Sequence, residues 1–187
     1  MKKLFIITLL FAVGVFSANA QEFAKGKSAV NLGLGLGSGY YGGSFYSFTW
    51  GMNGSYEMGI VEVPMGSKLK GVVGVGGLLG FSSNSYNYSF WDGKYRYTNV
   101  LIAARGTYHF IFMDKFDPYA GLYLGYQFTN AKWTGGGVEP VGYSVNSSSV
   151  RAGAFVGARY FFTNNFGVYA ELGYMLTVFN VGVTFQF

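Results

Sequence analysis

The feature that most constrains this chain is an alternation of side-chain character with a period of two residues. It is clearest at the C-terminus, where Phe179, Val181, Val183, Phe185 and Phe187 alternate with Asn180, Gly182, Thr184 and Gln186. Successive side chains of a β-strand point to opposite faces. The pattern therefore predicts a final strand with one large apolar face and one face of small or polar residues.

The same alternation recurs in seven earlier segments of the chain. These further predicted strands lie at about residues 29–35, 49–58, 73–81, 99–110, 121–128, 150–162 and 168–174. Bacterial single-chain membrane barrels have an even number of antiparallel strands of this kind. We therefore expect an all-β fold, an eight-stranded antiparallel up-and-down transmembrane β-barrel.

The composition favours a membrane environment for these strands. Charged residues make up 11% of the chain and aromatic residues 20%, whereas soluble domains carry about 25% charged residues. No run of about 18 apolar residues follows residue 20, so we expect no spanning helix. A closed barrel is the other structure that satisfies every backbone hydrogen bond in lipid. A soluble periplasmic β-protein is the alternative, but its core would need larger side chains than the Gly, Ser, Asn and Thr found here.

Residues 1–20 have the features of a cleaved secretory signal. Lys2 and Lys3 precede the apolar run LFIITLLFAVGVF, and the small residues Ser17-Ala18-Asn19-Ala20 follow it. The apolar run is shorter than the roughly 20 residues that a spanning helix needs. We therefore expect cleavage after Ala20 and a barrel domain of residues 21–187.

The residue types that are missing argue against several kinds of site. The sequence has no cysteine and one histidine, so we expect no disulfide, no acylated cysteine, no metal site and no cofactor. The basic residues form no cluster along the sequence, which argues against a nucleic-acid surface.

The C-terminal third resembles a known family. The segment ARYFFTNNFGVYAELGY followed by FNVGVTFQF resembles the outer-membrane β-barrel domain of Bacteroidota-type porin-family proteins, which is similar in architecture to opacity, OmpX and OmpA-membrane barrels. The resemblance implies Sec-dependent export to the outer membrane, contact with its lipid and lipopolysaccharide, and assembly by the barrel-assembly machinery. It also implies that Val181, Val183, Phe185 and Phe187 form the assembly signal. Phe187 should then face lipid at the periplasmic interface, and its deletion should impair assembly more than any activity.

Charged residues fall on the face of the alternation that would point into the barrel: Glu57, Arg105, Arg151, Arg159 and Glu171. Charges in a narrow lumen must be paired, because unpaired buried charges are costly. If the hairpin at residues 164–165 sets Phe161 opposite Tyr169, Arg159 lies opposite Glu171. We therefore predict an Arg159–Glu171 pair, joined by Arg105 and Glu57. A gate or ion path is one interpretation of this network, but a structural plug is favoured because side chains just fill an eight-stranded barrel.

The predicted outer surface is rich in aromatic residues. With both termini in the periplasm, the outer loops lie at about residues 36–46, 83–96, 130–148 and 176–178. They and the adjoining strand end carry Tyr86, Tyr88, Phe90, Trp91, Tyr95, Trp133 and Tyr143 among Ser, Asn and Gly, a composition typical of adaptable recognition loops. This predicts adhesion or binding of an extracellular ligand. The alternative is that the strands extend above the membrane and the aromatic residues pack on each other or on lipopolysaccharide.

Three functions remain open for such a barrel. The favoured one is a structural or surface-interaction role, and a narrow pore for small solutes is the alternative. A lipid A-modifying enzyme is the third, but it would need a nucleophile and a base. His109, between Tyr108 and Phe110, is interpreted as an interfacial residue near the periplasmic end, so we expect no catalytic residue.

Overall fold

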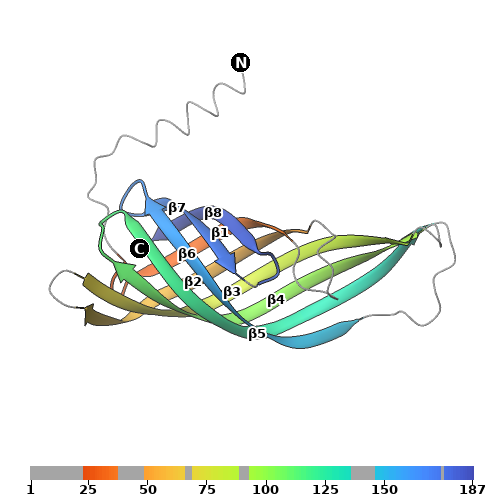
Figure 1. The fold of residues 1–187 in the computed structure, drawn as a ribbon, viewed down its shortest axis with the longest axis horizontal. Helices are drawn as coiled ribbons and strands as arrows, with labels where there is room; N and C mark the ends of the chain where they lie inside the picture. Colours follow the sequence, from red (N-terminus) through yellow and green to blue (C-terminus); the bar gives the residue numbers. More distant parts are fainter. Residues whose placement is uncertain (1–22, 38–48, 66–68, 89–92, 136–145, 174) are drawn as a thin grey trace, which may run out of the picture.

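The chain folds into a closed β-barrel (Figure 1). The computed structural model describes residues 23–37, 49–65, 69–88, 93–135, 146–173 and 175–187. The strands are β1 (Ser28–Leu36), β2 (Trp50–Met65), β3 (Leu69–Tyr88), β4 (Gly93–Ile111), β5 (Phe116–Gly135), β6 (Ser147–Phe161), β7 (Phe166–Gly173) and β8 (Phe179–Gln186). Neighbours in sequence pair antiparallel and β8 pairs with β1, so the predicted eight-stranded antiparallel up-and-down barrel is confirmed. The described residues include no helix that is both long and apolar enough to cross a membrane.

The ring closes through the backbone of the last residue. The Ser28 amide donates to the Phe187 carbonyl over 2.8 Å, and the Phe187 amide donates to the Ser28 carbonyl over 2.9 Å. From there β1 and β8 stay in register up to the pair Leu36 and Phe179. The end of the barrel at which β1 begins and β8 ends is called the terminus end below.

The predicted alternation is confirmed on both faces. Large apolar side chains are exposed on the outside, among them Leu32, Leu34, Met52, Met58, Leu79, Ile102, Leu122, Leu124, Val156, Leu172, Val181, Phe185 and Phe187. The buried side chains facing the lumen are mostly polar, among them Asn31, Ser55, Ser82, Asn99, Thr107, Gln127, Asn180 and Thr184. A β-bulge between Gly59 and Val61 shifts the β2 register by one residue, which keeps both Met58 and Val61 on the outer face.

β3, β4 and β5 are the longest strands, and β2 and β6 are intermediate with 16 and 15 residues. β3, β4 and β5 have 20, 19 and 20 residues, whereas β7 and β8 have eight each. The long strands project beyond the ring at the end away from the termini (Figure 1). We call residues 82–88 of β3, 93–99 of β4 and 129–135 of β5 the sheet extension. At the base of the sheet extension, Ser82 is the register partner of Asn99, and Asn99 is the register partner of Thr129.

The outer loops predicted at 83–96 and 130–148 are therefore shorter in the structure, because parts of both ranges belong to strands. β3 and β4 pair as far as Tyr88 and Gly93, and β4 pairs with β5 as far as Gly135. The Asn and Gly residues in these segments predicted loops because both residue types have weak strand propensity, although Tyr favours strands. Pairing of β4 with a strand on each side overrides that local preference. The tight fourth connection is present, because β7 ends at Gly173 and β8 begins at Phe179.

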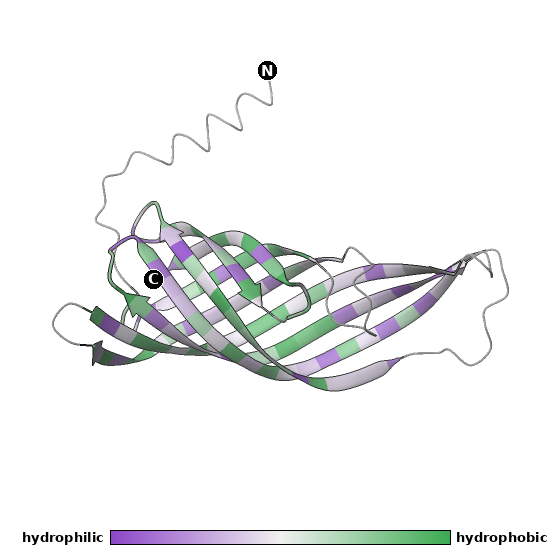
Figure 2. Ribbon diagram, in the orientation of Figure 1, coloured by the Kyte–Doolittle hydropathy of each residue, from purple (hydrophilic) through white to green (hydrophobic). Residues whose placement is uncertain are grey.

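Two belts of aromatic side chains bound the apolar outer wall. Trp50 and Phe81 lie 6.1 Å apart, ring centre to ring centre, near the sheet extension, and Phe166 and Phe185 lie 5.2 Å apart at the terminus end. The outward face of β5 rises about 30 Å from Phe116 to Phe128 at roughly 3.3 Å per residue and a tilt of about 40°, close to the apolar band of about 25 Å in outer-membrane barrels. Figure 2 shows the hydrophilic residues gathering along the sheet extension, beyond this band.

The closure predicts different effects for two changes at Phe187. Phe187→Ala removes the ring but keeps both hydrogen bonds to Ser28, whereas deletion of Phe187 removes both. We expect the deletion to lower the amount of folded barrel in the outer membrane more strongly than Phe187→Ala, because the seam loses its last backbone pair. The heat-dependent gel shift of folded barrels in membrane fractions measures this. Equal levels of the deleted and wild-type chains would contradict the role of this residue in assembly.

Candidate functional site

A cluster of ionisable side chains fills the lumen toward the terminus end. It consists of Glu57, Arg105, His109, Asp117, Arg159 and Glu171 and is called the lumen cluster below. Each is at most 3% exposed. They come from β2, β4, β5, β6 and β7, so the cluster joins strands from opposite sides of the ring.

Arg159 contacts two carboxylates of this cluster. Its Nη2 contacts Glu57 Oε1, its Nη1 donates to Asp117 Oδ2 over 3.2 Å, and its Nε donates to Asn31 Oδ1 over 3.3 Å. The guanidinium also lies 4.9 Å from the ring centre of Tyr119. A buried cation with three oxygen acceptors and an aromatic face is well compensated for the water that it loses.

His109 lies between two carboxylates. Its Nδ1 is 2.7 Å from Asp117 Oδ1, and its Nε2 is 3.0 Å from Glu57 Oε1. The imidazolium form lets both ring nitrogens donate. It also makes the cluster electrically neutral, because the three carboxylates otherwise face only two guanidinium groups. Neutrality is what a cluster shielded from water requires.

Arg105 and Glu171 form the other part of the cluster. Arg105 Nη2 donates to Glu171 Oε1 over 2.8 Å and lies 3.5 Å from Glu57 Oε2. Tyr119 donates its hydroxyl to the same Glu171 oxygen over 2.7 Å. The Nε and Nη1 of Arg105 have no hydrogen-bond partner, but the guanidinium lies 4.5 Å from the ring centre of Phe155. Cation–π attraction partly replaces the missing hydrogen bonds.

The predicted Arg159–Glu171 pair was wrong. The β6–β7 hairpin sets Phe161 opposite Gly167 and not opposite Tyr169, so Arg159 lies opposite Tyr169 and Glu171 opposite Gly157. The hairpin is tighter than assumed, because the Phe162 and Thr163 amides both donate to the Phe166 carbonyl. Arg159 therefore contacts Glu57 and Asp117, while Glu171 contacts Arg105.

Arg151, the fifth predicted lumen charge, lies apart from this cluster. Its Nε donates to Gln127 Oε1 over 3.0 Å, within a polar layer nearer the sheet extension. In that layer Gln127 and Thr129 both donate to Asn99 Oδ1, over 3.0 and 2.8 Å. The sequence thus indicated the face of Arg151 correctly but not its separation from the other charges.

Two apolar side chains close the lumen on either side of the lumen cluster. At the terminus end Gly26, with a φ of 84°, turns the chain so that Phe23 enters the barrel, and the ring of Phe23 lies 4.3 Å from that of His109. From the other side the β7–β8 connection inserts Leu176 among Leu78, Leu101 and Phe155. The lumen is therefore filled in layers by side chains of the described residues.

Several of these residues were missed or misread in the sequence. Asp117 was not among the predicted lumen charges and His109 was interpreted as an interfacial residue, but both are buried in the lumen. The alternation could have found them, since Asp117 is in phase with Gly121 of β5 and His109 with Arg105 of β4. Phe23 and Leu176 lie outside the strands, so no periodicity indicated them.

Thr107, His109 and Asp117 have the order of a nucleophile, base and acid. Thr107 Oγ1 is 3.0 Å from His109 Nε2, and His109 Nδ1 is 2.7 Å from Asp117. Glu57 faces the same Nε2 atom, so His109 donates there and cannot accept the threonine proton as a general base does. All three are buried, and Thr107 and His109 both lie within hydrogen-bonding distance of Glu57 in the lumen cluster.

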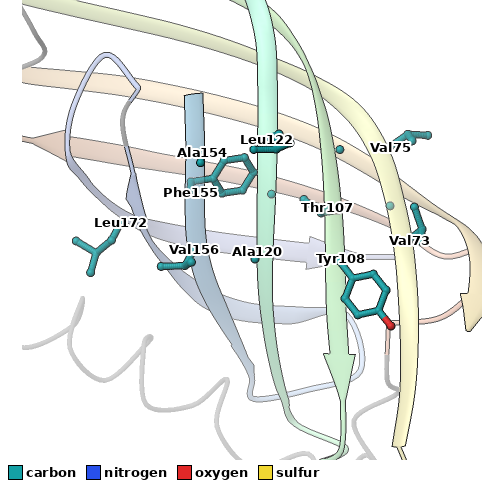
Figure 3. Close-up of a pocket in the computed structure, with 13 residues that line it drawn as sticks. Val73, Val75, Thr107, Tyr108, Ala120, Leu122, Ala154, Phe155, Val156 and Leu172 are labelled. Carbon is teal, nitrogen blue, oxygen red and sulfur yellow. The ribbon is translucent and has the colours of Figure 1, made fainter. Parts of the chain in front are cut away.

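A groove of about 680 Å³ lies on the outer wall (Figure 3). Val73, Val75, Leu122 and Leu172 are among its lining residues, and Ala120 and Ala154 leave space between the larger side chains. Thr107 also lines the groove, but its hydroxyl bonds inward to His109. The groove presents an apolar, lipid-facing surface without a reactive group.

The predicted surface aromatics are only partly described. Trp133 lies on β5 with its indole packed against Gly93, where any side chain would collide with it. Tyr86 and Tyr95 are register partners, and Tyr95 is in turn opposite Trp133. Tyr88 lies at the tip of β3. Phe90, Trp91 and Tyr143 lie outside the described residues.

Comparisons with known proteins agree with this architecture. A family model described as outer membrane protein beta-barrel domain matches residues 8–187. Two crystal structures of Ail, the attachment invasion locus protein of Yersinia pestis, are similar at 17% identity over 87% of this chain and 99% of the Ail chain. Their TM-scores are 0.55, for the complex with the heparin analogue sucrose octasulfate, and 0.50.

A third solved structure is the N-terminal β-barrel domain of Pseudomonas aeruginosa OprF. It is 16% identical over 89% of this chain and 100% of that domain, with a TM-score of 0.47. No curated protein matches the sequence significantly.

The lumen cluster predicts unequal effects for two arginine substitutions. Arg159→Met leaves Glu57 and Asp117 buried without their main cation, so we expect it to destabilise the barrel by about 3–5 kcal/mol. Arg151→Met is the matched control at the partly exposed site, and it should cost under about 1 kcal/mol. Urea unfolding in detergent, followed by the gel shift, measures both. Equal effects of the two changes would contradict the central position of Arg159.

The filled lumen also predicts that the barrel does not conduct. In planar bilayers the purified protein should give no large, stable single-channel steps, because side chains occupy the space that an eight-stranded ring encloses. An open porin in the same bilayer provides the control. Large and stable steps would contradict the plug interpretation.

Proposed function

Because the chain belongs to the outer membrane protein beta-barrel domain family and lies in the outer membrane, we propose that it is a surface-interaction barrel that binds an extracellular ligand or surface through its sheet extension. The observation that carries this proposal is the contrast between the two ends. The lumen is closed by Phe23, the lumen cluster and Leu176, while three long strands project from the opposite end (Figure 1).

The proposed orientation places the termini in the periplasm and the sheet extension outside the cell. Connections at the terminus end are short, since β2 ends at Met65 and β3 begins at Leu69, and β6 ends at Phe161 and β7 begins at Phe166. Outer-membrane barrels have short periplasmic turns and longer extracellular connections. Cleavage of residues 1–20 stays a prediction, because these residues lie outside the described ones.

Aromatic residues on the sheet extension support a recognition role. Trp133 is held against Gly93, so its ring is fixed before a ligand arrives, and a rigid aromatic anchor binds at a low entropy cost. Tyr86 and Tyr95 occupy the same cross-strand row. The likeness in fold to Ail, whose name describes an attachment invasion locus protein, supports attachment as the kind of interaction.

The two other functions have less support. A narrow pore would need a water-filled path, whereas Phe23, the lumen cluster and Leu176 are buried side chains that occupy the lumen. A lipid A-modifying enzyme would need an accessible base, whereas His109 is completely buried between carboxylates. We therefore propose that the protein is not an enzyme.

The biogenesis and lipid partners also belong to this proposal. Val181, Val183, Phe185 and Phe187 lie on the outward face of β8, and three of them are well exposed, which supports their role as the signal read by the barrel-assembly machinery. The outer apolar wall supports contact with outer-membrane lipid and lipopolysaccharide. We also propose a Bacteroidota-type branch of the family, on the resemblance of the segment from Ala158 to Tyr174 noted in the sequence.

The aromatic surface predicts the result of an attachment assay. Cells displaying the triple variant Trp91→Ala, Tyr95→Ala and Trp133→Ala should lose binding to host cells or matrix that the wild-type chain confers, because the aromatic anchors are removed. The matched control replaces Phe112, Tyr160 and Phe162 at the terminus end and should bind normally once surface levels are equalised. Unchanged attachment of the first variant would remove the proposal.

A further inference from the structure

The structure brings a distant lysine beside two basic residues that are close together in the sequence. Lys94 and Arg96 lie on β4 and Lys132 on β5, with Arg96 directly opposite Lys132. Arg96 and Lys132 are exposed and Lys94 is half-buried. All three have the strand phase of the outward residues Ile102 and Phe128. We call them the basic row, a cluster that the sequence did not show.

Placing like charges side by side on a sheet has an energetic cost. Directly opposite residues of antiparallel strands have Cβ atoms about 5 Å apart, and like charges there destabilise the sheet. None of the five side-chain carboxylates of the described residues lies near enough to offset this repulsion. Glu57, Asp117 and Glu171 lie in the lumen, and Glu62 and Asp114 lie at the terminus end. An anion from outside the chain would relieve this repulsion.

The height of the basic row indicates where that anion comes from. Lys132 follows Phe128, the last apolar residue of the outward face of β5, by four residues, a rise of about 10 Å at roughly 3.3 Å per residue and a tilt of about 40°. The basic row therefore lies just beyond the apolar band, on the wall that faces the surrounding lipid. At this height an outer-leaflet lipid presents its charged head group.

We propose that Lys94, Arg96 and Lys132 bind the phosphate groups of a lipopolysaccharide molecule lying against the outer wall of the sheet extension. Arg96 can contact a phosphate through two parallel N–H donors, and the two lysines add point charges beside it. The proposal rests on the orientation given under the proposed function but not on ligand binding by Trp133, Tyr86 and Tyr95. It gives the two faces of the sheet extension different partners, because the basic row lies on the face opposite to Trp133.

Lipopolysaccharide binding by the purified full-length barrel tests this assignment. We expect native mass spectrometry in detergent to show about tenfold weaker binding of rough lipopolysaccharide to the variant Lys94→Gln, Arg96→Gln and Lys132→Gln, as expected for the loss of three exposed charge pairs. Lipopolysaccharide dephosphorylated with hydrofluoric acid should bind wild type and variant equally weakly. The matched control, Lys25→Gln, Lys70→Gln and Lys115→Gln, removes the same charge at the terminus end and should bind as wild type does.

Three results would overturn the proposal. One is unchanged affinity of the basic-row variant for lipopolysaccharide. Another is a loss limited to the soluble polyanion sucrose octasulfate, which would assign the row to an aqueous ligand. The third is a more than tenfold gain in lipopolysaccharide affinity for the variant Asp92→Asn with Glu139→Gln. These two carboxylates lie outside the described residues, and such a gain would show that they pair with the basic row within the chain. The gel shift confirms that each variant is folded. The attachment assay on the basic-row variant distinguishes failure of the lipopolysaccharide proposal from failure of the proposed attachment function.

Discussion

The structure depends on one constraint, which is that a backbone surrounded by lipid must find all its hydrogen bonds within the protein. A sheet meets this requirement only when it has no edge, so every feature of the strands serves closure. The reciprocal hydrogen bonds of Ser28 and Phe187 complete the ring, and the bulge in β2 keeps the apolar residues outside. Above the apolar band this constraint disappears, and there β3 to β5 continue as an open sheet.

Closure with eight strands creates a second problem, because the lumen is too narrow for bulk water yet receives charged side chains. These charges are neutralised by side chains of opposite charge from other strands of the ring. Glu57, on β2, contacts cations from β4 and β6, so its carboxylate is shared by strands that are not neighbours. Such a network stabilises the barrel mainly by avoiding unpaired charge, and replacing the whole cluster with apolar residues could be equally stable. The cluster is thus a structural element with a specific geometry.

The sequence predicted the elements that follow from periodicity. The strand count, the inward and outward faces and the four inward charges of the lumen cluster that were named all follow from a period of two. Register within a hairpin does not, because it depends on turn geometry, and an error of two residues opposite Phe161 was enough to assign Arg159 the wrong partner. Phe23 and Leu176 enter the lumen from connections, where no repeating pattern exists. The basic row was incomplete in the sequence for a similar reason: Lys132 joins Lys94 and Arg96 only through the pairing of β4 with β5.

These features divide the molecule by environment. In the apolar band, contact with lipid requires apolar side chains on the outer face, and the inner face requires charges that balance. Neither set of side chains is therefore available to bind a ligand. The sheet extension has neither restriction, since water satisfies its backbone edges and its side chains. Trp133 on one face and Lys132 on the other are adjacent in sequence but point in opposite directions, which is a direct consequence of strand geometry. A strand that leaves the membrane can therefore hold to the lipid surface with one face while the other stays available to a partner from outside.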